Sequence, residues 1–198
     1  MRVVFGFVLA LCVGVGACFG SAQAANSAQA NGRIVTLKIG DLAVLGNIQC
    51  RVFSNSPRHP YEYAHVQCSN GPLSKATYSF VTNGGIDVWQ KGVSAHIYSI
   101  ATMGSGQHVT NSWKAKRIVR LRVGDVAVVP DGYRPNGHIG HQPLRVQCRA
   151  YSHTYLRCSS GPLSKAPYSA GITKGGINVY KKGSSAPIYS TPPAATSG

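Results

Sequence analysis

Side chains that could perform acid–base chemistry are scarce in this sequence. The chain has 198 residues but only five acidic residues and seven histidines. Asp41 and Asp125 occupy matching Gly-Asp turns, where an aspartate usually accepts hydrogen bonds from its own backbone. Glu62, Asp87 and Asp131 have no acidic counterpart, so no paired-carboxylate or Ser–His–Asp site follows from the spacing. We therefore predict that the protein is not an enzyme and uses no cofactor.

The histidines and cysteines do not have the spacing of a metal site. The candidate groups are His138 and His141 with His153, or His59 with His65, but no histidine has a histidine counterpart in the other half of the chain. Zinc ligands commonly occur as Cys-x-x-Cys, a spacing that this sequence lacks. We predict no metal site.

An excess of positive charge is the clearest indication of a binding partner. The formal net charge is +15. Residues 101–198 hold thirteen basic and two acidic residues, compared with six and three in residues 33–100. Such an excess favours association with anions. The candidates are polysaccharide, lipid head groups, teichoic-acid-like polymer and nucleic acid.

Arginines and tyrosines of the second half form the candidate binding site. Arginine combined with aromatic side chains on a β-face is how single-stranded nucleic acid and other anionic polymers are held. A basic surface that only confers solubility is the alternative interpretation. The predicted anion-binding residues are Arg117, Arg120, Arg122, Arg149, Tyr151, Tyr155, Arg157 and Lys165.

The sequence contains an internal duplication. Arg33–Leu45 matches Arg117–Val129 at eight of thirteen positions, Cys68–Ser79 matches Cys158–Ser169 at ten of twelve, and Gly84–Ser99 matches Gly175–Ser190 at eleven of sixteen. Three collinear blocks of this length indicate a tandem repeat. The second block contains the turn Gly-Pro-Leu-Ser-Lys, which ends at Lys75 or Lys165 and is either a structural corner or a ligand loop.

Alternation within these blocks predicts strands and no helix. Val35, Leu37 and Ile39 alternate with polar residues, and so do Val119, Leu121 and Val123, so each set is expected to face a core. Short strands with glycine turns predict an all-β protein, a tandem repeat of two small β-barrel or sandwich domains with one disulfide each. The predicted boundaries are a signal peptide at 1–24, a flexible N-terminus at 25–32, β-domain repeats at 33–100 and 117–190, a linker at 101–116 and a flexible tail at 191–198.

Hairpin geometry predicts which cysteines pair. The segment from Cys148 to Cys158 is nearly symmetric about His153, so folding it there places the two cysteines opposite each other. The same fold brings Arg149 opposite Arg157, Ala150 opposite Leu156 and Tyr151 opposite Tyr155, with the arginines and tyrosines facing outward. Cys50 pairs with Cys68 in the same way around a longer loop. We therefore expect the disulfides Cys50–Cys68 and Cys148–Cys158.

The N-terminus resembles a secretory signal. Met1-Arg2 precedes a short apolar run from Val3 to Ala17, and Ala22-Gln23-Ala24 is an A-x-A cleavage site. We expect cleavage after Ala24, a secreted or extracytoplasmic location and no transmembrane span in the mature form. Lipidation at Cys18 is the less favoured alternative.

These observations leave three functional hypotheses. The first is a non-enzymatic exported module that binds an anionic cell-envelope or extracellular polymer through the second repeat, without specific nucleic-acid recognition. The second is a structural or protein-interaction role, with a protein partner such as that of an inhibitor or adhesin. The third is a basic secreted toxin or antimicrobial that acts on anionic membranes.

Overall fold

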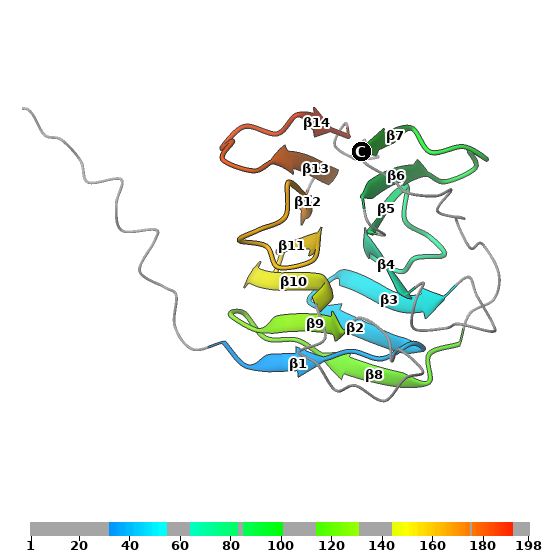
Figure 1. Ribbon diagram of the computed structural model, residues 1–198. Coiled ribbons are helices and arrows are strands. Elements are labelled where there is room, and N and C mark those ends of the chain that lie inside the picture. The colour runs from blue at the N-terminus through cyan, green and yellow to red at the C-terminus, as the bar shows by residue number, and fades with distance from the viewer. Residues whose placement is uncertain are drawn as a thin grey trace, which may run out of the picture. The chain divides into compact units, whose positions relative to one another are not determined.

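The computed structural model describes residues 32–54, 64–82, 85–100, 114–130, 144–174 and 176–191, all of which lie in one compact unit, Asn31–Gly198. Within these ranges the chain forms strands and no helix, which confirms the predicted all-β class. The strands belong to two seven-stranded sheets (Figure 1).

We call the sheet that holds most of the first repeat sheet 1, and the other sheet 2. Sheet 1 has the order β7-β6-β5-β4-β3-β2-β8. Its strands are β7 (Tyr98–Ile100), β6 (Ile86–Gln90), β5 (Tyr78–Thr82), β4 (Ala64–Asn70), β3 (Ile48–Ser54), β2 (Asp41–Leu45) and β8 (Arg117–Arg120). Sheet 2 has the order β1-β9-β10-β11-β12-β13-β14. Its strands are β1 (Ile34–Thr36), β9 (Val126–Pro130), β10 (Leu144–Ser152), β11 (Tyr155–Ser160), β12 (Tyr168–Thr173), β13 (Gly176–Lys181) and β14 (Tyr189–Ser190).

Each half of the chain donates its first strand to the sheet of the other half. β1 runs parallel to β9, with Ile34 opposite Val126, whereas β8 runs parallel to β2, with Ile118 opposite Leu42. These two registers are equivalent under the sequence repeat. The remaining pairings described within the two sheets are antiparallel. The two halves are therefore intertwined through a reciprocal exchange of strands.

The exchange is reinforced by two crossed ion pairs. Arg33 donates from Nη2 to Oδ2 of Asp125 at 2.9 Å, and Arg117 forms the equivalent pair with Asp41. Each aspartate also accepts a backbone N–H from its own turn, Asp41 from Lys38 at 2.7 Å and Asp125 from Arg122 at 2.8 Å. The predicted backbone capping is thus present, together with an ion pair to the other half that the sequence did not reveal.

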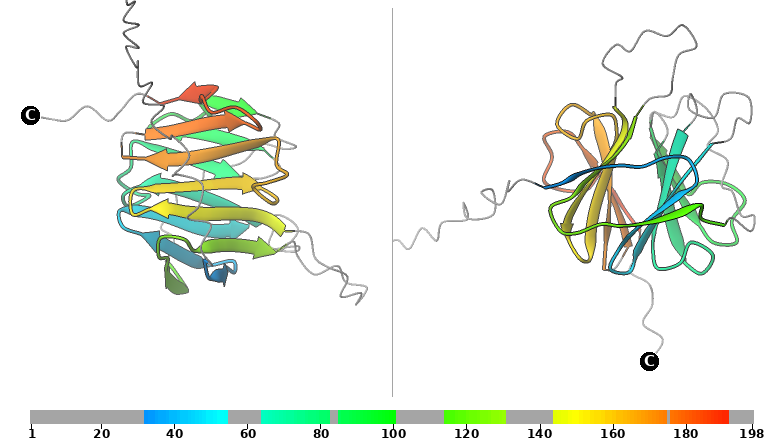
Figure 2. Two further views of the ribbon diagram at one scale, coloured as in Figure 1. Left: turned by 90° about the vertical axis from the view of Figure 1, so that its left-hand side faces the viewer. Right: turned by 90° about the horizontal axis from the view of Figure 1, so that it is seen from below.

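One core lies between the two sheets, which pack face to face as a sandwich (Figure 2). The disulfides Cys50–Cys68 and Cys148–Cys158 form as predicted, and both lie in this core. The Sγ atoms of Cys68 and Cys158, which are equivalent residues, are 3.9 Å apart. Farther along the sandwich, the equivalent residues Tyr98 and Tyr189 stack with ring centroids 4.2 Å apart. Residues from both halves therefore share a single buried cluster.

This topology does not establish two separate domains. Exchanged strands and a shared core join the halves that the sequence suggested as independent units. The predicted signal peptide, the lipidation site at Cys18, most of the linker at 101–116 and nearly all of the flexible tail lie outside the described residues. So do residues 55–63 and 131–143, where His59, His138 and His141 occur.

Most of the predicted hairpin register is confirmed. Cys148 lies opposite Cys158, Arg149 opposite Arg157 and Ala150 opposite Leu156. Tyr155, however, pairs with Ser152 rather than with Tyr151, because the register shifts between Ala150 and Ser152. An irregularity of this kind near a hairpin turn adds a residue to one strand and re-aims the side chains beside it.

One inward-facing prediction is wrong. Val119 and Leu121 contact the core, but Val123 is 46% exposed. Strand β8 ends at Arg120, and the chain then crosses from sheet 1 to sheet 2 before β9 begins. The alternation of a strand does not continue through such a crossing.

Candidate anion-binding face

The outer face of sheet 2 carries a cluster of arginine and tyrosine side chains. We define the Arg–Tyr face as Arg149 and Tyr151 on β10, Tyr155 and Arg157 on β11, and Tyr180 on β13. In β10 and β11 the intervening residues Cys148, Ala150, Leu156 and Cys158 are buried in the core. Strand alternation therefore turns the arginines and tyrosines away from the core. Figure 2 (left) looks onto this side of the molecule, where the strands of sheet 2 lie side by side.

Two guanidinium groups lie at directly opposed positions of this face. Arg149 pairs with Arg157 across β10 and β11. The Arg149 guanidinium lies 5.4 Å from the ring centroid of Tyr151, and that of Arg157 lies 4.5 Å from the ring centroid of Tyr180. Like charges placed opposite each other in a sheet are destabilising. The ring contacts stabilise each guanidinium but do not neutralise it, so both positive charges remain on this face.

Arg157 is held in place by a further contact. Its Nε donates to the Oγ of Ser169 on β12 at 2.7 Å. Because Nε is used and the guanidinium plane lies over Tyr180, the terminal Nη groups are the donors that remain for a ligand. A guanidinium fixed in this way presents two N–H donors side by side, which matches the geometry of carboxylate, sulfate or phosphate oxygens.

Tyr155 lies at the centre of the cluster. Its ring stacks on Tyr151 with centroids 5.4 Å apart, and it lies against the backbone of Gly171 on β12. A Cβ atom added to Gly171 would come within 2.7 Å of Cε2 of Tyr155, so a glycine is needed where the ring rests on the sheet. Burial, and then the proximity of Tyr180, raise the pKa of Tyr155 to about 12. A hydrogen bond to the Tyr180 side chain also raises this pKa, so the phenol is protonated at neutral pH and linked to the neighbouring ring.

The matching face of sheet 1 is closed. Arg51, Phe53, His65, Gln67 and Trp89 occupy the positions equivalent to the Arg–Tyr face, and each is at most 6% exposed. Arg51 Nε donates to Oε1 of Gln67 at 2.9 Å, and Gln67 Nε2 donates to Ser79 Oγ at 3.0 Å. Burial lowers the pKa of Arg51. Tyr151, in contrast, is 46% exposed, so the repeat provides one buried and one accessible version of the same face.

The structure separates the predicted binding residues into three groups. Arg149, Tyr151, Tyr155 and Arg157 lie together on the outer face of sheet 2. Arg117 and Arg120 lie on β8 at the edge of sheet 1, and Arg122 lies in the crossing that follows it. Lys165 is exposed in the turn after β11. The assumption that all eight residues share one surface came from their positions in the second repeat, and the strand exchange is the reason that they do not.

The turn that contains Lys165 has a structural explanation. The backbone N–H groups of Lys165 and Ala166 both donate to the Pro162 carbonyl at 2.9 Å, and Ser159 Oγ donates to the Gly161 carbonyl at 2.9 Å. Gly161 has a φ of 79°, a left-handed conformation that favours glycine. Equivalent bonds occur around Pro72 in the first half. These contacts account for the strong similarity of this segment between the repeats without a ligand.

Tyr180 was missed as a site residue. The sequence pairs it with Trp89 under the repeat and suggests packing, but the structure places it beneath the guanidinium of Arg157. The alternation Ile177, Asn178, Val179, Tyr180 marks it as outward-facing. The sequence does not show the register of β12 and β13. In that register Tyr180 lies opposite Ser169, which accepts the hydrogen bond from Arg157.

Comparison with known protein families, with curated proteins and with solved structures finds no match to this chain. In the part of the chain that the structure describes, no helix is long and apolar enough to cross a bilayer.

Proposed function

We propose that the protein is a non-enzymatic binding module that holds an anionic polymer of the cell envelope or extracellular space on its Arg–Tyr face. The observation that supports this most directly is the opposed pair Arg149 and Arg157, each lying over a tyrosine ring. The three aspartates in the described ranges are engaged elsewhere: Asp41 and Asp125 with the crossed arginines, and Asp87 with Ser99 at 2.6 Å on sheet 1. An anionic ligand would supply the missing negative charge.

The shape of the face favours an extended ligand. Val126, Arg149 and Arg157 lie in register across three neighbouring strands, β9, β10 and β11. Strands in a sheet are about 4.8 Å apart, so this row spans about 10 Å. The exposed ring of Tyr151 offers stacking surface to the apolar face of a sugar ring or to another flat group, and the guanidinium groups offer paired donors to acidic substituents.

The two disulfides indicate an extracellular or other oxidising environment. Export through the N-terminal signal, with cleavage after Ala24, is part of the proposal. It explains why a protein with this charge would meet an envelope or extracellular polymer rather than intracellular nucleic acid. We also propose that the two halves are copies of one β-unit, a view supported by their equivalent registers and their equivalent disulfides.

Retention on an anionic matrix tests the proposal. We would measure elution of the protein from dextran sulfate and from polygalacturonate in a salt gradient. We expect the double variant Arg149→Ser/Arg157→Ser to elute at clearly lower salt than the wild type. The matched control Lys75→Ser/Lys91→Ser removes the same charge from exposed turns of the first half and should elute close to the wild type.

Two results would contradict the proposal. Equal losses in the two double variants would show that net charge alone, and not the Arg–Tyr face, retains the protein. Retention that does not respond to salt would show that counterion release does not drive binding. The second outcome favours the protein-interaction hypothesis, for which an interface of mixed polarity is expected.

A further inference from the structure

A second surface lies at the end of the sandwich where the strands are exchanged. We call it the crossed end and define it as residues 33–41 and 116–125, which contain β1, β8 and the two crossings that follow them. Viewed from below, these segments pass over each other and close the sandwich (Figure 2, right). None of these residues belongs to the Arg–Tyr face.

Large apolar side chains are exposed at the crossed end. Ile34 is 73% exposed, Ile118 is 61% exposed and Val123 is 46% exposed. Their neighbours Leu37 and Leu121 supply the buried contacts that anchor these segments to the core. Ile34 and Ile118 are equivalent under the repeat, so the same apolar residue is exposed twice at one end of the molecule. Neither side chain belongs to the buried core.

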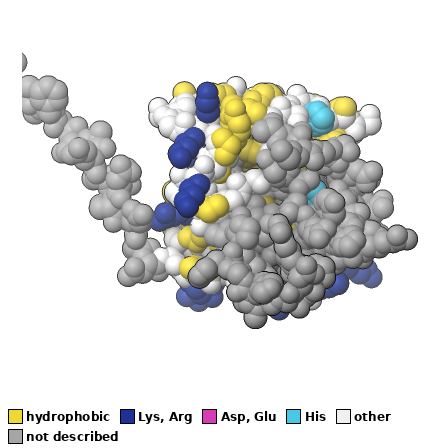
Figure 3. Space-filling view, viewed as in Figure 1, with side chains coloured by type: hydrophobic (Ala, Val, Ile, Leu, Met, Phe, Trp, Pro, Cys, Tyr) yellow, Lys and Arg dark blue, Asp and Glu magenta, His cyan; other side chains and the backbone are white. Residues whose placement is uncertain are grey.

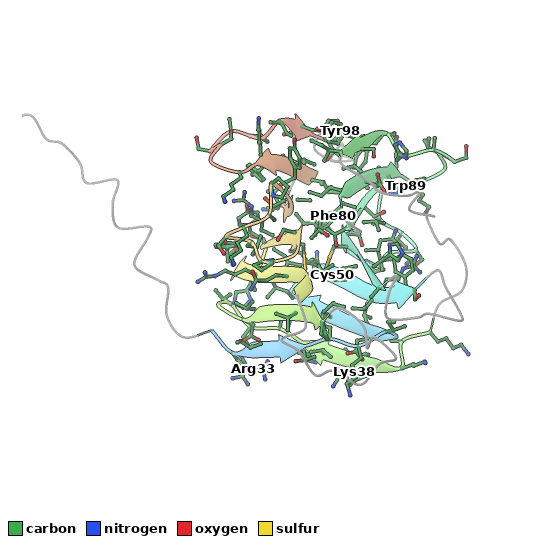
Figure 4. The ribbon with its side chains drawn as sticks, in the orientation of Figure 1. Arg33, Lys38, Cys50, Phe80, Trp89 and Tyr98 are labelled. Atoms are coloured by element: carbon green, nitrogen blue, oxygen red, sulfur yellow. A yellow bond between two sulfur atoms is a disulfide. The ribbon has the colours of Figure 1, made fainter. Side chains whose placement is uncertain are left out.

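Positive charge surrounds these apolar side chains. Lys38, Lys116, Arg120 and Arg122 are all exposed on the crossed end, and none of them forms an ion pair with a carboxylate of the described residues. Dark blue lysine and arginine side chains gather along the lower edge of the molecule in Figure 3, and Arg33 and Lys38 lie at this end in Figure 4.

The acidic residues of this end are already neutralised. Asp41 is 3% exposed and Asp125 is 4% exposed, and each is paired with one of the crossed arginines. Burial would raise the pKa of each carboxyl group, but the hydrogen bonds from the arginine and from the turn backbone lower it below the usual value. Both aspartates are therefore ionised. Among the described residues of this end, their two negative charges balance only two of six cations, Arg33, Lys38, Lys116, Arg117, Arg120 and Arg122.

We infer that the crossed end binds the surface of a lipid bilayer that contains anionic lipid. A soluble polyanion would engage the cations and leave the isoleucines in water, whereas the interface of a bilayer accommodates both kinds of side chain. Apolar groups insert at the level of the head groups, and lysine and arginine remain among the phosphates. The charge and the exposed apolar residues are thus explained by one partner. The inference concerns a different surface from the Arg–Tyr face and does not depend on it.

Vesicle sedimentation tests this inference. The purified protein is mixed with vesicles of phosphatidylcholine alone, or of phosphatidylcholine with about one third phosphatidylglycerol, and the bound fraction is measured. Binding should require the anionic lipid. Vesicles of phosphatidylcholine alone measure the binding that does not require anionic lipid.

Two double variants separate the contributions. Lys38→Ser/Arg122→Ser should weaken binding to the anionic vesicles about thirtyfold, because each cation near such a surface contributes about a factor of five. Ile34→Ser/Ile118→Ser should weaken it about tenfold or more by removing apolar surface from the interface. The second variant should still bind dextran sulfate as the wild type does, since its charge is unchanged.

Matched controls lie at the opposite edges of the two sheets. Lys91→Ser/Lys182→Ser removes two exposed and equivalent lysines there, and Val93→Ser/Ile188→Ser removes two exposed apolar side chains. Both controls should bind the anionic vesicles as the wild type does.

If Ile34→Ser/Ile118→Ser binds vesicles like the wild type, the crossed end is at most a site for soluble polyanions, and the inference is wrong. Absence of binding to anionic vesicles would also overturn it. Arg149→Ser/Arg157→Ser should keep vesicle binding even where it loses polymer retention, so the two proposals can fail independently.

Discussion

The crossed ion pair between Arg33 and Asp125 offers a direct test of the strand exchange. Arg33 precedes β1 in the first half, and Asp125 lies at the start of the β9 region in the second half. In a fold without exchange, each arginine would pair with the aspartate of its own half. Arg33 would then lie beside Asp41, and Arg117 beside Asp125. A double-mutant cycle can therefore distinguish the two topologies in solution.

The contacts of Asp125 set the size of the effect. Its Oδ2 accepts the Arg122 N–H at 2.8 Å and the Arg33 Nη2 at 2.9 Å, while its side chain is 5% exposed. Asp125→Ala leaves a backbone donor without its partner, at a cost of about 1–3 kcal/mol, and also removes the ion pair. The Arg33 side chain is 57% exposed, so Arg33→Ala should cost only about 0.2–1 kcal/mol. Most of the loss in Asp125→Ala therefore comes from the turn and not from the arginine.

The assay is the free energy of unfolding from denaturant titration of the wild type, the single variants and the double variants. We expect a coupling energy of about 1 kcal/mol between Arg33 and Asp125. Arg33 and Asp41 should show additive effects within about 0.3 kcal/mol. Coupling of Arg33 to Asp41 with additivity towards Asp125 would show that each first strand lies in its own half, and the described topology would be wrong.

Three further outcomes follow from single contacts or from the topology. Gly171→Val copies the valine found at the matching place in the first half and should displace the Tyr155 ring, at a cost of about 1–3 kcal/mol in the free energy of unfolding. NMR titration of this variant should show the Tyr155 pKa falling from about 12 towards its usual value of about 10. After cleavage at a protease site inserted within residues 101–113, the two halves should elute together in gel filtration without denaturant. Separate elution would show that the strand exchange and the shared core do not keep the halves together. The lowered pKa values of Asp41 and Asp125 stabilise the protein above the unfolded pKa of about 3.9, and this contribution is lost as the pH falls through the lower folded values. The variant Asp41→Asn/Asp125→Asn should show a flatter loss of stability in acid, and an unchanged acid profile would mean that other groups control it.

Local patterns predicted much of the sheet structure. The symmetry of the segment around His153 gave the register of β10 and β11 and the pairing of Cys148 with Cys158, because neighbouring strands joined by a short turn have few ways to pair. The outward positions of Arg149 and Arg157 followed from the same alternation. The Tyr151 position was misjudged by one residue, since a register shift beside a turn leaves no clear mark in the residue types.

The composition of the site could be predicted only within one hairpin. Arg149, Tyr151, Tyr155 and Arg157 are close in sequence, and the structure brings them together. Tyr180 and the supporting Ser169 come from later strands and depend on pairing across β11, β12 and β13. Arg117 and Arg120 belong to the same repeat as the site residues, which predicts a shared surface, but their strand lies in the other sheet.

The sequence by itself determined that the chain is all-β, that its two halves repeat one pattern, and which cysteines pair within each half. These properties depend on alternation, turn residues and short separations along the chain. Only the tertiary structure decided that the first strands are exchanged, since Arg33 could pair with either Asp41 or Asp125 and the two segments are nearly identical. For the same reason, the shared core and the different exposure of the two outer faces could not be predicted. Because the two copies carry equal local information, packing and chain connection decide whether a first strand pairs with its own half or with the other half.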